Sequence, residues 1–433
     1  MKNGMSTKLE KARTYQQTAL CTGNTSPKPI FHMSAPVGWM NDPNGFSEYK
    51  GEKHLFFQYH PYSTVWGPMH WGHVKSEDFI RWENLPVALA PDEAYDEFGC
   101  YSGSAIEDNG RHILAYTGVV RKEQKDGTIF ERQRMCIAIG DGEKYRKIDA
   151  NPVIDERLLP PGASKVDFRD PKIWKEGDTY YLIAGNRSED GSGQILEYRS
   201  EDLEHWEFVQ VYDRSANRYG RMWECPDLFS LEDKKILMIS PQEVQREDNI
   251  FHPGDNTLFI LGREDETGAF REEKLMPVDR GLDFYAPQSM ETTDGRRIMI
   301  GWLASWAANW FDATDGFSGM MTVPRELTLK DGKILQNPVR ELAAYHEKEV
   351  VLKDRVISGE EETLEELSGR VLDMDLDLEA DPEAHIYLKL AAKGDLYTEV
   401  DYDFRTGTLI FDRTHSGTGR DCAHMRRVKT ENA

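Results

Sequence analysis

Residues 49–60 read YKGEKHLFFQYH, in which a polar turn containing glycine is followed by a short run of strand-forming residues. Four later stretches have the same shape: EDNGRHILAYTG at 107–118, KEGDTYYLIAG at 175–185, LEDKKILMIS at 231–240 and TDGRRIMIGW at 293–302. Aligned on Leu55, Ile113, Tyr180, Ile236 and Ile298, they follow one another at 58, 67, 56 and 62 residues. This period fits one four-stranded sheet with its loops. The sequence therefore predicts an all-β protein built on a five-bladed propeller.

A second, weaker repeat has the same register. SEDFIRW at 76–82 and SEDLEHW at 200–206 lie 124 residues apart, which is about two of the longer repeats. A chance resemblance of two acidic turns is the alternative. Each follows its own aligned strand at a similar distance, so we favour repetition.

Polar residues recur on the strand expected before each aligned strand. Ten to thirteen residues ahead of the aligned positions stand Asp42, Ser102, Asp170, Glu224 and Tyr285. The innermost strands of a propeller surround a central channel. We therefore expect these five side chains to converge at one mouth of the channel.

Three segments place an acid beside or near a proline: WMNDPNG at 39–45, FRDPK at 168–172 and WECPD at 223–227. Proline restricts its own backbone and that of the residue before it, which suits a preorganised catalytic group. Such segments are also ordinary turn starters, and one alone would indicate a loop. Three such segments at equivalent positions of the repeat favour a catalytic role for their acids. Arg169 and Asp170 are neighbours, so both can face the channel only at a strand end or a bulge.

A pair of carboxyl groups with aromatic walls is the equipment of glycoside hydrolysis. Polar residues available to bind sugar hydroxyls are Asn41, Gln58, Ser102, Arg169 and Asp170. Aromatic residues available as apolar walls are Trp39, Trp66, Tyr101, Trp223 and Trp302. For each tryptophan taken singly, core packing is the alternative.

Charge and composition exclude several classes of partner. The sequence has 53 Lys and Arg against 76 Asp and Glu, a formal net charge of -23, which disfavours nucleic acid and anionic membranes. The first thirty residues lack the apolar run of a secretory peptide, so we expect a cytoplasmic protein. The five cysteines contain no CxxC pair, and His70 and His73 lack helical metal-ligand spacing. We therefore expect free thiols, no metal and no cofactor.

The pattern predicts three parts of the chain. These are an N-terminal extension at 1–27, the propeller at 28–335 and a smaller β-sandwich domain at 336–433. KDGKILQNP at 330–338 resembles a linker, and alternating runs such as RVLDMDLDLE, HIYLKLAA and TLIFDR follow it. The polar C-terminal residues lack a closing strand, so the sandwich is expected to be incomplete.

These motifs together resemble glycoside hydrolase family 32, the β-fructofuranosidases, which include invertases, sucrose-6-phosphate hydrolases and fructan hydrolases. WMNDPNG, FRDPK and WECPDLF are similar to the family's three hallmark motifs, and HWGH, YSGSA, DFYAPQ and MTVPREL agree with it. The resemblance implies a five-bladed propeller followed by a β-sandwich. The sequence departs from the family at Tyr101, where relatives often have Phe, and in its shorter C-terminal domain.

The resemblance also implies roles for individual residues. Asp42 would be the nucleophile, Glu224 the general acid and then base, and Asp170 the group that stabilises the transition state. Glu224 would have to hold a proton near neutrality. Residues implied for, or available to, the substrate subsite are Asn41, Gln58, Trp66, Tyr101, Ser102, Arg169 and Trp302.

The predicted function is a retaining hydrolase that releases β-D-fructose from sucrose or sucrose 6-phosphate, with short fructans as further substrates. One alternative is a fructosyltransferase, in which a sugar replaces water as acceptor. Another is a carbohydrate-binding propeller without catalysis. The expected partner is a small sugar, and assembly into a homo-oligomer stays open.

Overall fold

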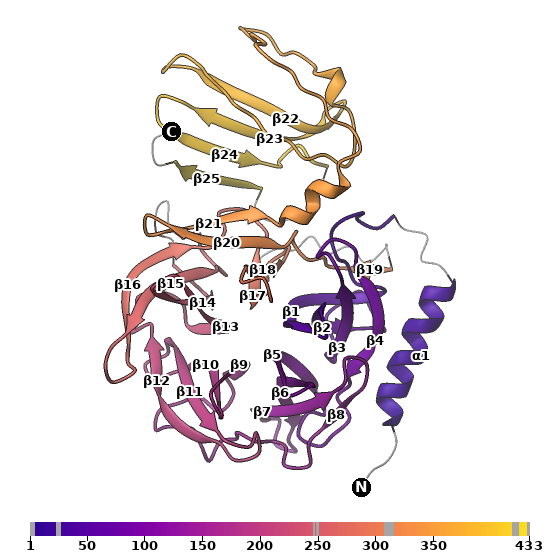
Figure 1. The fold of residues 1–433 in the computed structure, drawn as a ribbon, viewed down its shortest axis with the longest axis vertical. Coiled ribbons are helices and arrows are strands. Elements are labelled where there is room, and N and C mark those ends of the chain that lie inside the picture. The colour runs from indigo at the N-terminus through magenta and orange to yellow at the C-terminus, as the bar shows by residue number, and fades with distance from the viewer. Residues whose placement is uncertain are drawn as a thin grey trace. The chain divides into compact units, whose positions relative to one another are not determined.

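The computed structural model describes residues 5–22, 27–245, 247, 251–306, 316–417 and 424–430. The chain divides into two compact units, Met1–Val339 and Arg340–Ala433. In the first unit, five sheets lie around a common centre (Figure 1), and all of their strand pairs are antiparallel except the short pairing of β1 (Gly38–Tyr49) with β19 (Phe317–Ser318).

Four strands form the body of each sheet in chain order, and the short β19, which falls in sequence between two strands of sheet 5, pairs with β1 in sheet 1. Sheet 1 has β1 (Gly38–Tyr49), β2 (Glu52–His60), β3 (His70–Ser76), β4 (Glu83–Leu89) and the short β19 (Phe317–Ser318). Sheet 2 has β5 (Gly99–Asp108), β6 (Arg111–Glu123), β7 (Ile129–Gly140) and β8 (Tyr145–Lys147). Sheet 3 has β9 (Phe168–Glu176), β10 (Thr179–Arg187), β11 (Gly193–Ser200) and β12 (Glu207–Arg214). Sheet 4 has β13 (Met222–Leu231), β14 (Lys234–Gln242), β15 (Leu258–Glu264) and β16 (Phe270–Pro277). Sheet 5 has β17 (Tyr285–Glu291), β18 (Arg297–Trp302), β20 (Arg325–Lys330) and β21 (Lys333–Pro338).

The first strands of the five sheets, β1, β5, β9, β13 and β17, form a closed ring. Each contacts the first strand of the next sheet, and β17 contacts β1. These strands lie nearest the centre in Figure 1. The predicted five-bladed propeller is confirmed, and each sheet is one blade.

The aligned sequence repeats lie on the second strand of each blade, where Leu55, Ile113, Tyr180, Ile236 and Ile298 are all buried. Strand β14 shows why these runs are apolar on both faces. Leu237 and Ile239 pack into the core between blades 3 and 4, whereas Ile236 and Met238 pack into the core between blades 4 and 5. Alternate side chains of a strand point to opposite faces, so a blade between two neighbours needs apolar residues at every position.

The two segments of the weaker repeat, 76–82 and 200–206, form the same kind of turn. The Oδ1 atom of Asp78 accepts hydrogen bonds from two backbone N–H groups, and Asp202 does the same in blade 3. Phe79 (φ 65°) and Leu203 (φ 72°) follow them in the left-handed region and are buried. The two segments are therefore equivalent in structure.

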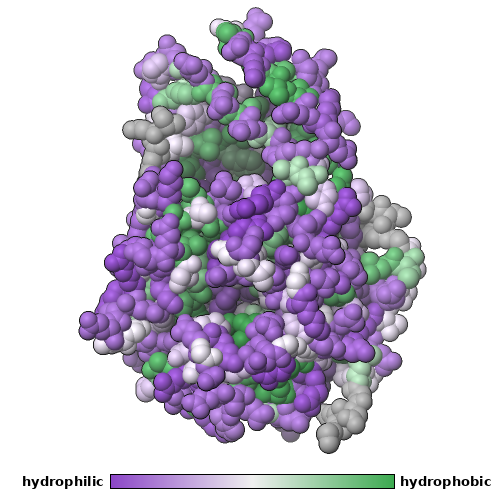
Figure 2. Space-filling view, viewed as in Figure 1, coloured by the Kyte–Doolittle hydropathy of each residue, from purple (hydrophilic) through white to green (hydrophobic). Residues whose placement is uncertain are grey.

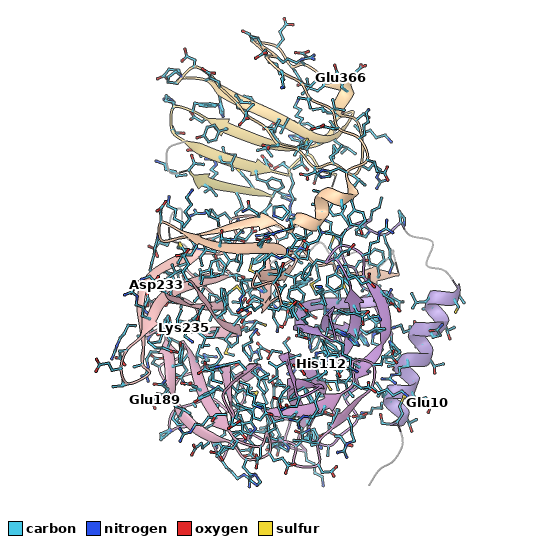
Figure 3. The ribbon with its side chains drawn as sticks, in the orientation of Figure 1. Glu10, His112, Glu189, Asp233, Lys235 and Glu366 are labelled. Carbon is cyan, nitrogen blue, oxygen red and sulfur yellow. The ribbon has the colours of Figure 1, made fainter. Side chains whose placement is uncertain are left out.

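The N-terminal extension contains a helix, α1 (Thr7–Thr22), which the sequence pattern did not indicate. The helix lies along β4, the outer strand of blade 1. Leu9 and Ala12 are buried, while Glu10, labelled in Figure 3, is exposed. Gln16 Nε2 donates a hydrogen bond to the carbonyl oxygen of Leu85 at 2.9 Å. The helix thus covers a strand edge that would otherwise present unpaired backbone groups.

The boundary between the units differs from the expected one. KDGKILQNP was predicted to be a linker, but β21 runs through it as the outer strand of blade 5. A boundary at 335/336 would cut this strand, and the contacts divide the chain after Val339 instead. The propeller therefore extends beyond 28–335 at its C-terminal end.

The second unit contains one four-stranded antiparallel sheet in its described residues. Its strands are β22 (His385–Lys393), β23 (Leu396–Asp403), β24 (Thr408–Asp412) and β25 (Met425–Lys429), and the short 3-10 helices Arg340–Tyr345 and Glu365–Leu367 precede them. RVLDMDLDLE at 370–379 forms no paired strand, so its alternation misled the prediction. The polar C-terminal segment was predicted to lack a strand, but β25 lies in it and pairs with β24. The sheet supplies one layer of the predicted β-sandwich.

The surface of the propeller and the cysteines agree with the composition of the sequence. Figure 2 shows mainly hydrophilic residues over the propeller on the face that it presents. No described helix is long and apolar enough to cross a membrane. Cys100, Cys136 and Cys225 are buried free thiols and Cys21 is an exposed one, whereas Cys422 lies outside the described residues.

Candidate active site

All five first strands carry a β-bulge at the predicted site residue or directly after it. In β1 the pairing shifts between Met40 and Pro43, so one extra residue is inserted opposite β2. Equivalent single-residue insertions fall at Ser102, Asp170, Cys225 and Ala286 of the other first strands. A bulge turns neighbouring side chains out of the regular alternation. This resolves how Arg169 and Asp170 can both face the channel.

The sequence explains the bulges locally. Four of them contain a proline, which cannot donate a backbone hydrogen bond to the next strand: Pro43, Pro171, Pro226 and Pro287. In blade 2 the corresponding residue is Gly103, where a Cβ atom would lie 2.0 Å from the carbonyl oxygen of Ala115. Asp170 (φ 64°) and Cys225 (φ 46°) adopt the left-handed region. Such strained backbone is held where a site requires it.

The first strands of blades 1 to 4 contribute residues from or beside their bulges to one cavity of about 320 Å³, whereas no residue of β17 lines it. Its lining residues are Asn41, Asp42, Gln58, Trp66, Tyr101, Ser102, Glu131, Gln133, Asp167, Arg169, Asp170, Glu224, Gln242 and Trp306. The three predicted acids are thus brought together from blades 1, 3 and 4. A volume of this size suits a small ligand.

Asp42 is buried and held by several donors. Ser102 Oγ donates to its Oδ2 atom at 2.6 Å, and Asn41 Nδ2 donates to Oδ1 at 3.0 Å. Trp39 Nε1 in turn fixes the amide of Asn41 at 2.8 Å. Burial and the charge of Glu224 raise the pKa of Asp42, and the donor bonds act in the opposite direction. The carboxyl group of Asp42 is therefore held in one orientation by donors on both of its oxygens.

Asp170 and Asp42 lie on either side of Cys225. The Cys225 Sγ atom is 3.6 Å from Oδ2 of each carboxyl group, and the Cys225 backbone N–H donates to Asp170 at 3.0 Å. Burial raises the pKa of Asp170, as do the charges of Glu224 and Asp42, while Arg169 lowers it. The two acids share one electrostatic environment without direct contact through a hydrogen bond.

Glu224 is held by a cation on one oxygen and a phenol on the other. Arg169 Nε lies 2.8 Å from Oε1, and the Tyr285 hydroxyl lies 2.6 Å from Oε2. Both partners come from neighbouring first strands, β9 and β17. The carboxyl group of Glu224 is therefore held by one partner from each of the two neighbouring blades.

Gln58, Trp66, Tyr101 and Arg169, all predicted for the substrate subsite, line the cavity together with Asn41 and Ser102. Trp302 does not. Its side chain is fully buried and packs edge-on to Trp39 and Trp306, at centroid distances of 6.1 Å and 5.0 Å. Trp306 lines the cavity instead. Two further predicted walls, Trp223 and Trp39, do not line the cavity either. Trp223 is fully buried in the core between blades 3 and 4, and Trp39 is buried beneath Asn41.

Five lining residues were not predicted: Glu131, Gln133, Asp167, Gln242 and Trp306. Glu131 and Gln133 lie two apart on β7, the third strand of blade 2, so they share a face. Residues 131–134 are polar at every position, so no alternation in the sequence marks these two as lining residues. Asp167 directly precedes FRDPK and could have been included with that motif.

The described residues contain no group of three His, Cys, Asp or Glu side chains arranged to hold a metal ion. His70 and His73 are both buried. His70 Nδ1 lies 2.9 Å from the carbonyl oxygen of Pro68, and His73 Nε2 lies 2.9 Å from His54 Nδ1. His112, labelled in Figure 3, stacks on Tyr49 at 4.6 Å between blades 1 and 2. His54, His73 and His112 thus pack together between blades 1 and 2.

A propeller mouth with several carboxyl groups, hydroxyl-binding side chains and aromatic walls is the site of a carbohydrate-active hydrolase. Comparison with known proteins narrows this class. Residues 32–338 match the Glycosyl hydrolases family 32 N-terminal domain. A sucrose-6-phosphate hydrolase of Zymomonas mobilis is 39% identical over 406 residues, which is 90% of this chain and 77% of that protein.

Solved structures give the same result. The GH32 β-fructofuranosidase of Bombyx mori superimposes with a TM-score of 0.81 at 34% identity, over 97% of this chain and 86% of that one. A point mutant of the same enzyme in complex with sucrose gives 0.80 at 34% identity over the same shares. The chain belongs to glycosyl hydrolases family 32 and is a fructofuranosidase-type glycoside hydrolase.

Proposed function

We propose that the protein hydrolyses sucrose or sucrose 6-phosphate and releases fructose with retention of configuration. The convergence of Asp42, Asp170 and Glu224 from three blades on one cavity carries the proposal. The sucrose-6-phosphate hydrolase of Z. mobilis and the sucrose complex of the B. mori enzyme support this substrate class.

In the proposed mechanism, Asp42 attacks the anomeric carbon of the fructosyl unit while Glu224 donates its proton to the leaving oxygen. The products of this step are the leaving sugar and a fructosyl ester on Asp42. Glu224 then takes a proton from water as the water attacks the same carbon and frees Asp42. The Ser102 and Asn41 donors orient Asp42 for the first step.

The fructosyl unit is held by the remaining lining residues. Asp170 is fixed by the backbone N–H of Cys225 and accepts hydrogen bonds from the hydroxyl groups of the fructosyl unit. Asn41, Gln58, Trp66, Tyr101, Ser102 and Arg169 complete the subsite. Short fructans, which end in the same unit, are proposed as secondary substrates. A cytoplasmic location stays a prediction.

The test is to follow both products from sucrose and from sucrose 6-phosphate. Equal release of fructose and of glucose or its phosphate supports hydrolysis, whereas glucose in excess of free fructose, with oligosaccharides, indicates a fructosyltransferase. Sugar binding without turnover indicates a carbohydrate-binding propeller. Proton NMR during the first turnovers should show β-fructose before mutarotation, and α-fructose would exclude Asp42 as the nucleophile.

A further inference from the structure

We propose that a second wall of the cavity, formed by Glu131, Gln133 and Asp167, binds the leaving sugar and selects a neutral hexose over a phosphorylated one. On this proposal the enzyme prefers sucrose to sucrose 6-phosphate. The inference rests on the proposed function, because it takes Glu224 as the acid that meets the leaving oxygen.

Hydrogen bonds place this wall beside Glu224. Gln133 Nε2 donates to Oε1 of Glu131 at 3.1 Å, and Gln133 Oε1 accepts from Arg169 Nη1 at 3.2 Å. Arg169 Nη1 also lies 3.4 Å from Oδ1 of Asp167. The Nε atom of the same guanidinium lies 2.8 Å from Glu224. Glu131, Gln133 and Asp167 are therefore connected to the acid through one side chain.

The nucleophile has different neighbours. Asp42 is bonded to Ser102 and Asn41, which come from the first strands of blades 2 and 1. Protonation of the leaving oxygen requires the acid to lie between the fructosyl unit and the leaving sugar. The leaving hexose therefore falls on the Glu224 side, where carboxylate and amide oxygens can accept hydrogen bonds from its hydroxyl groups.

The charge of the cavity opposes a phosphate group. Among the lining residues in the described part of the chain, five are acids and Arg169 is the single cation. The Arg169 guanidinium already contacts Glu224 and Asp167. A phosphate monoester carries between one and two negative charges near neutral pH, so it would meet carboxylates of the same sign.

A further cation beside this wall, Arg121, is already paired. Arg121 Nε lies 3.4 Å from Oε2 of Glu131, and its guanidinium lies 5.7 Å from the ring centroid of Phe98. Arg121 does not line the cavity. Glu131 thus both adds a negative charge to the wall and holds this cation in an ion pair. Replacing Glu131 by glutamine removes the charge and releases Arg121 while keeping the hydrogen-bonding shape.

The experiment measures kcat/KM for fructose release from sucrose and from sucrose 6-phosphate. We expect wild type to favour sucrose by at least about tenfold, and Glu131→Gln to reduce this ratio several-fold. In wild type the ratio should also fall as NaCl rises, because salt screens charge repulsion at a partly open site. Glu123→Gln makes the same charge change on the same β6–β7 hairpin, outside the cavity, and should keep the ratio.

Equal or better use of sucrose 6-phosphate by wild type would overturn the proposal. The proposal would also be overturned if the ratio of kcat/KM for the two substrates stayed the same in a folded Glu131→Gln variant and in high salt. If Glu131→Gln fails to fold, the salt series on wild type decides. Failure to release fructose from either substrate would instead overturn the proposed function, so the two failures are distinguishable.

Discussion

The Tyr285 hydroxyl oxygen lies 2.6 Å from Oε2 of Glu224 and 3.0 Å from the carbonyl oxygen of Ser240. Burial raises the pKa of Tyr285, so the phenol keeps its single proton. When that proton points to Ser240, the phenol oxygen can accept a hydrogen bond from protonated Glu224. When it points to Glu224, it stabilises the carboxylate. Tyr285 can therefore support both the acid and the base state that double displacement requires.

Tyr285→Phe should lower kcat by about 10-fold to 100-fold with a smaller change in KM, because it removes the partner of the proton donor. Steady-state kinetics with sucrose measure this. The loss should shrink with an aryl β-fructoside, whose leaving group needs little protonation. Tyr212→Phe, which removes another buried phenol bonded to a carboxylate, Glu264, away from the cavity, should leave kcat unchanged. Equal losses on both substrates would assign Tyr285 a purely structural role.

Ser102→Ala should shift the acid limb of the kcat/KM profile to higher pH. The Ser102 hydrogen bond lowers the pKa of Asp42, so its removal raises that pKa further. Attack requires ionised Asp42, and the loss should therefore be larger at acid pH, about tenfold there, than at neutral pH. A pH series with sucrose measures it, with Ser230→Ala on the exposed side of β13 as control. An unmoved acid limb would contradict the orientation role of Ser102.

Substitutions of Trp306 and Trp302 should show which of the two contacts the substrate and which stabilises the core. Trp306→Ala should raise KM for sucrose several-fold with little loss of stability, because Trp306 lines the cavity. Trp302→Ala should lower the free energy of unfolding by about 3–5 kcal/mol, because its side chain is fully buried. Urea unfolding and sucrose kinetics on both variants measure this. The reverse pattern would restore Trp302 to the substrate site.

Gln16→Ala should destabilise the propeller by about 1–3 kcal/mol without changing kcat. It leaves the buried carbonyl oxygen of Leu85 without the donor that α1 supplies. Gln17→Ala changes an exposed residue of the same helix and should leave stability unchanged. Thermal and urea unfolding of both variants measure the difference. Equal stability of the two would mean that α1 contributes little to covering β4.

Much of the propeller could be predicted because its signal is local. Second strands such as β14 are buried on both faces, so they repeat as apolar runs at nearly constant spacing. Helix α1 could not be read in the same way. Of its sixteen residues only Leu9, Ala12 and Gln16 are buried, so its apolar face is too narrow to give a clear period.

The candidate site was predictable where sequence motifs coincide with bulges. NDP, RDP and ECP mark the insertions in β1, β9 and β13, which is why the three acids were found together. Trp302 and Trp306 are close in sequence and both pack against Trp39. Only the tertiary structure, in which Trp302 is fully buried and Trp306 lines the cavity, separates the two. Glu131 and Gln133 reach it because the long β6–β7 hairpin extends to the cavity, a tertiary effect without a local signal.

The central claim is that Asp42 forms the bond to the fructosyl unit. The most direct measurement is kcat for fructose release from sucrose by Asp42→Asn beside wild type, after unfolding curves have shown equal stability. The account predicts a loss of about four orders of magnitude, because the amide keeps the shape of the carboxyl group but is a far weaker nucleophile. Turnover close to that of wild type would remove Asp42 from the mechanism and contradict the double displacement.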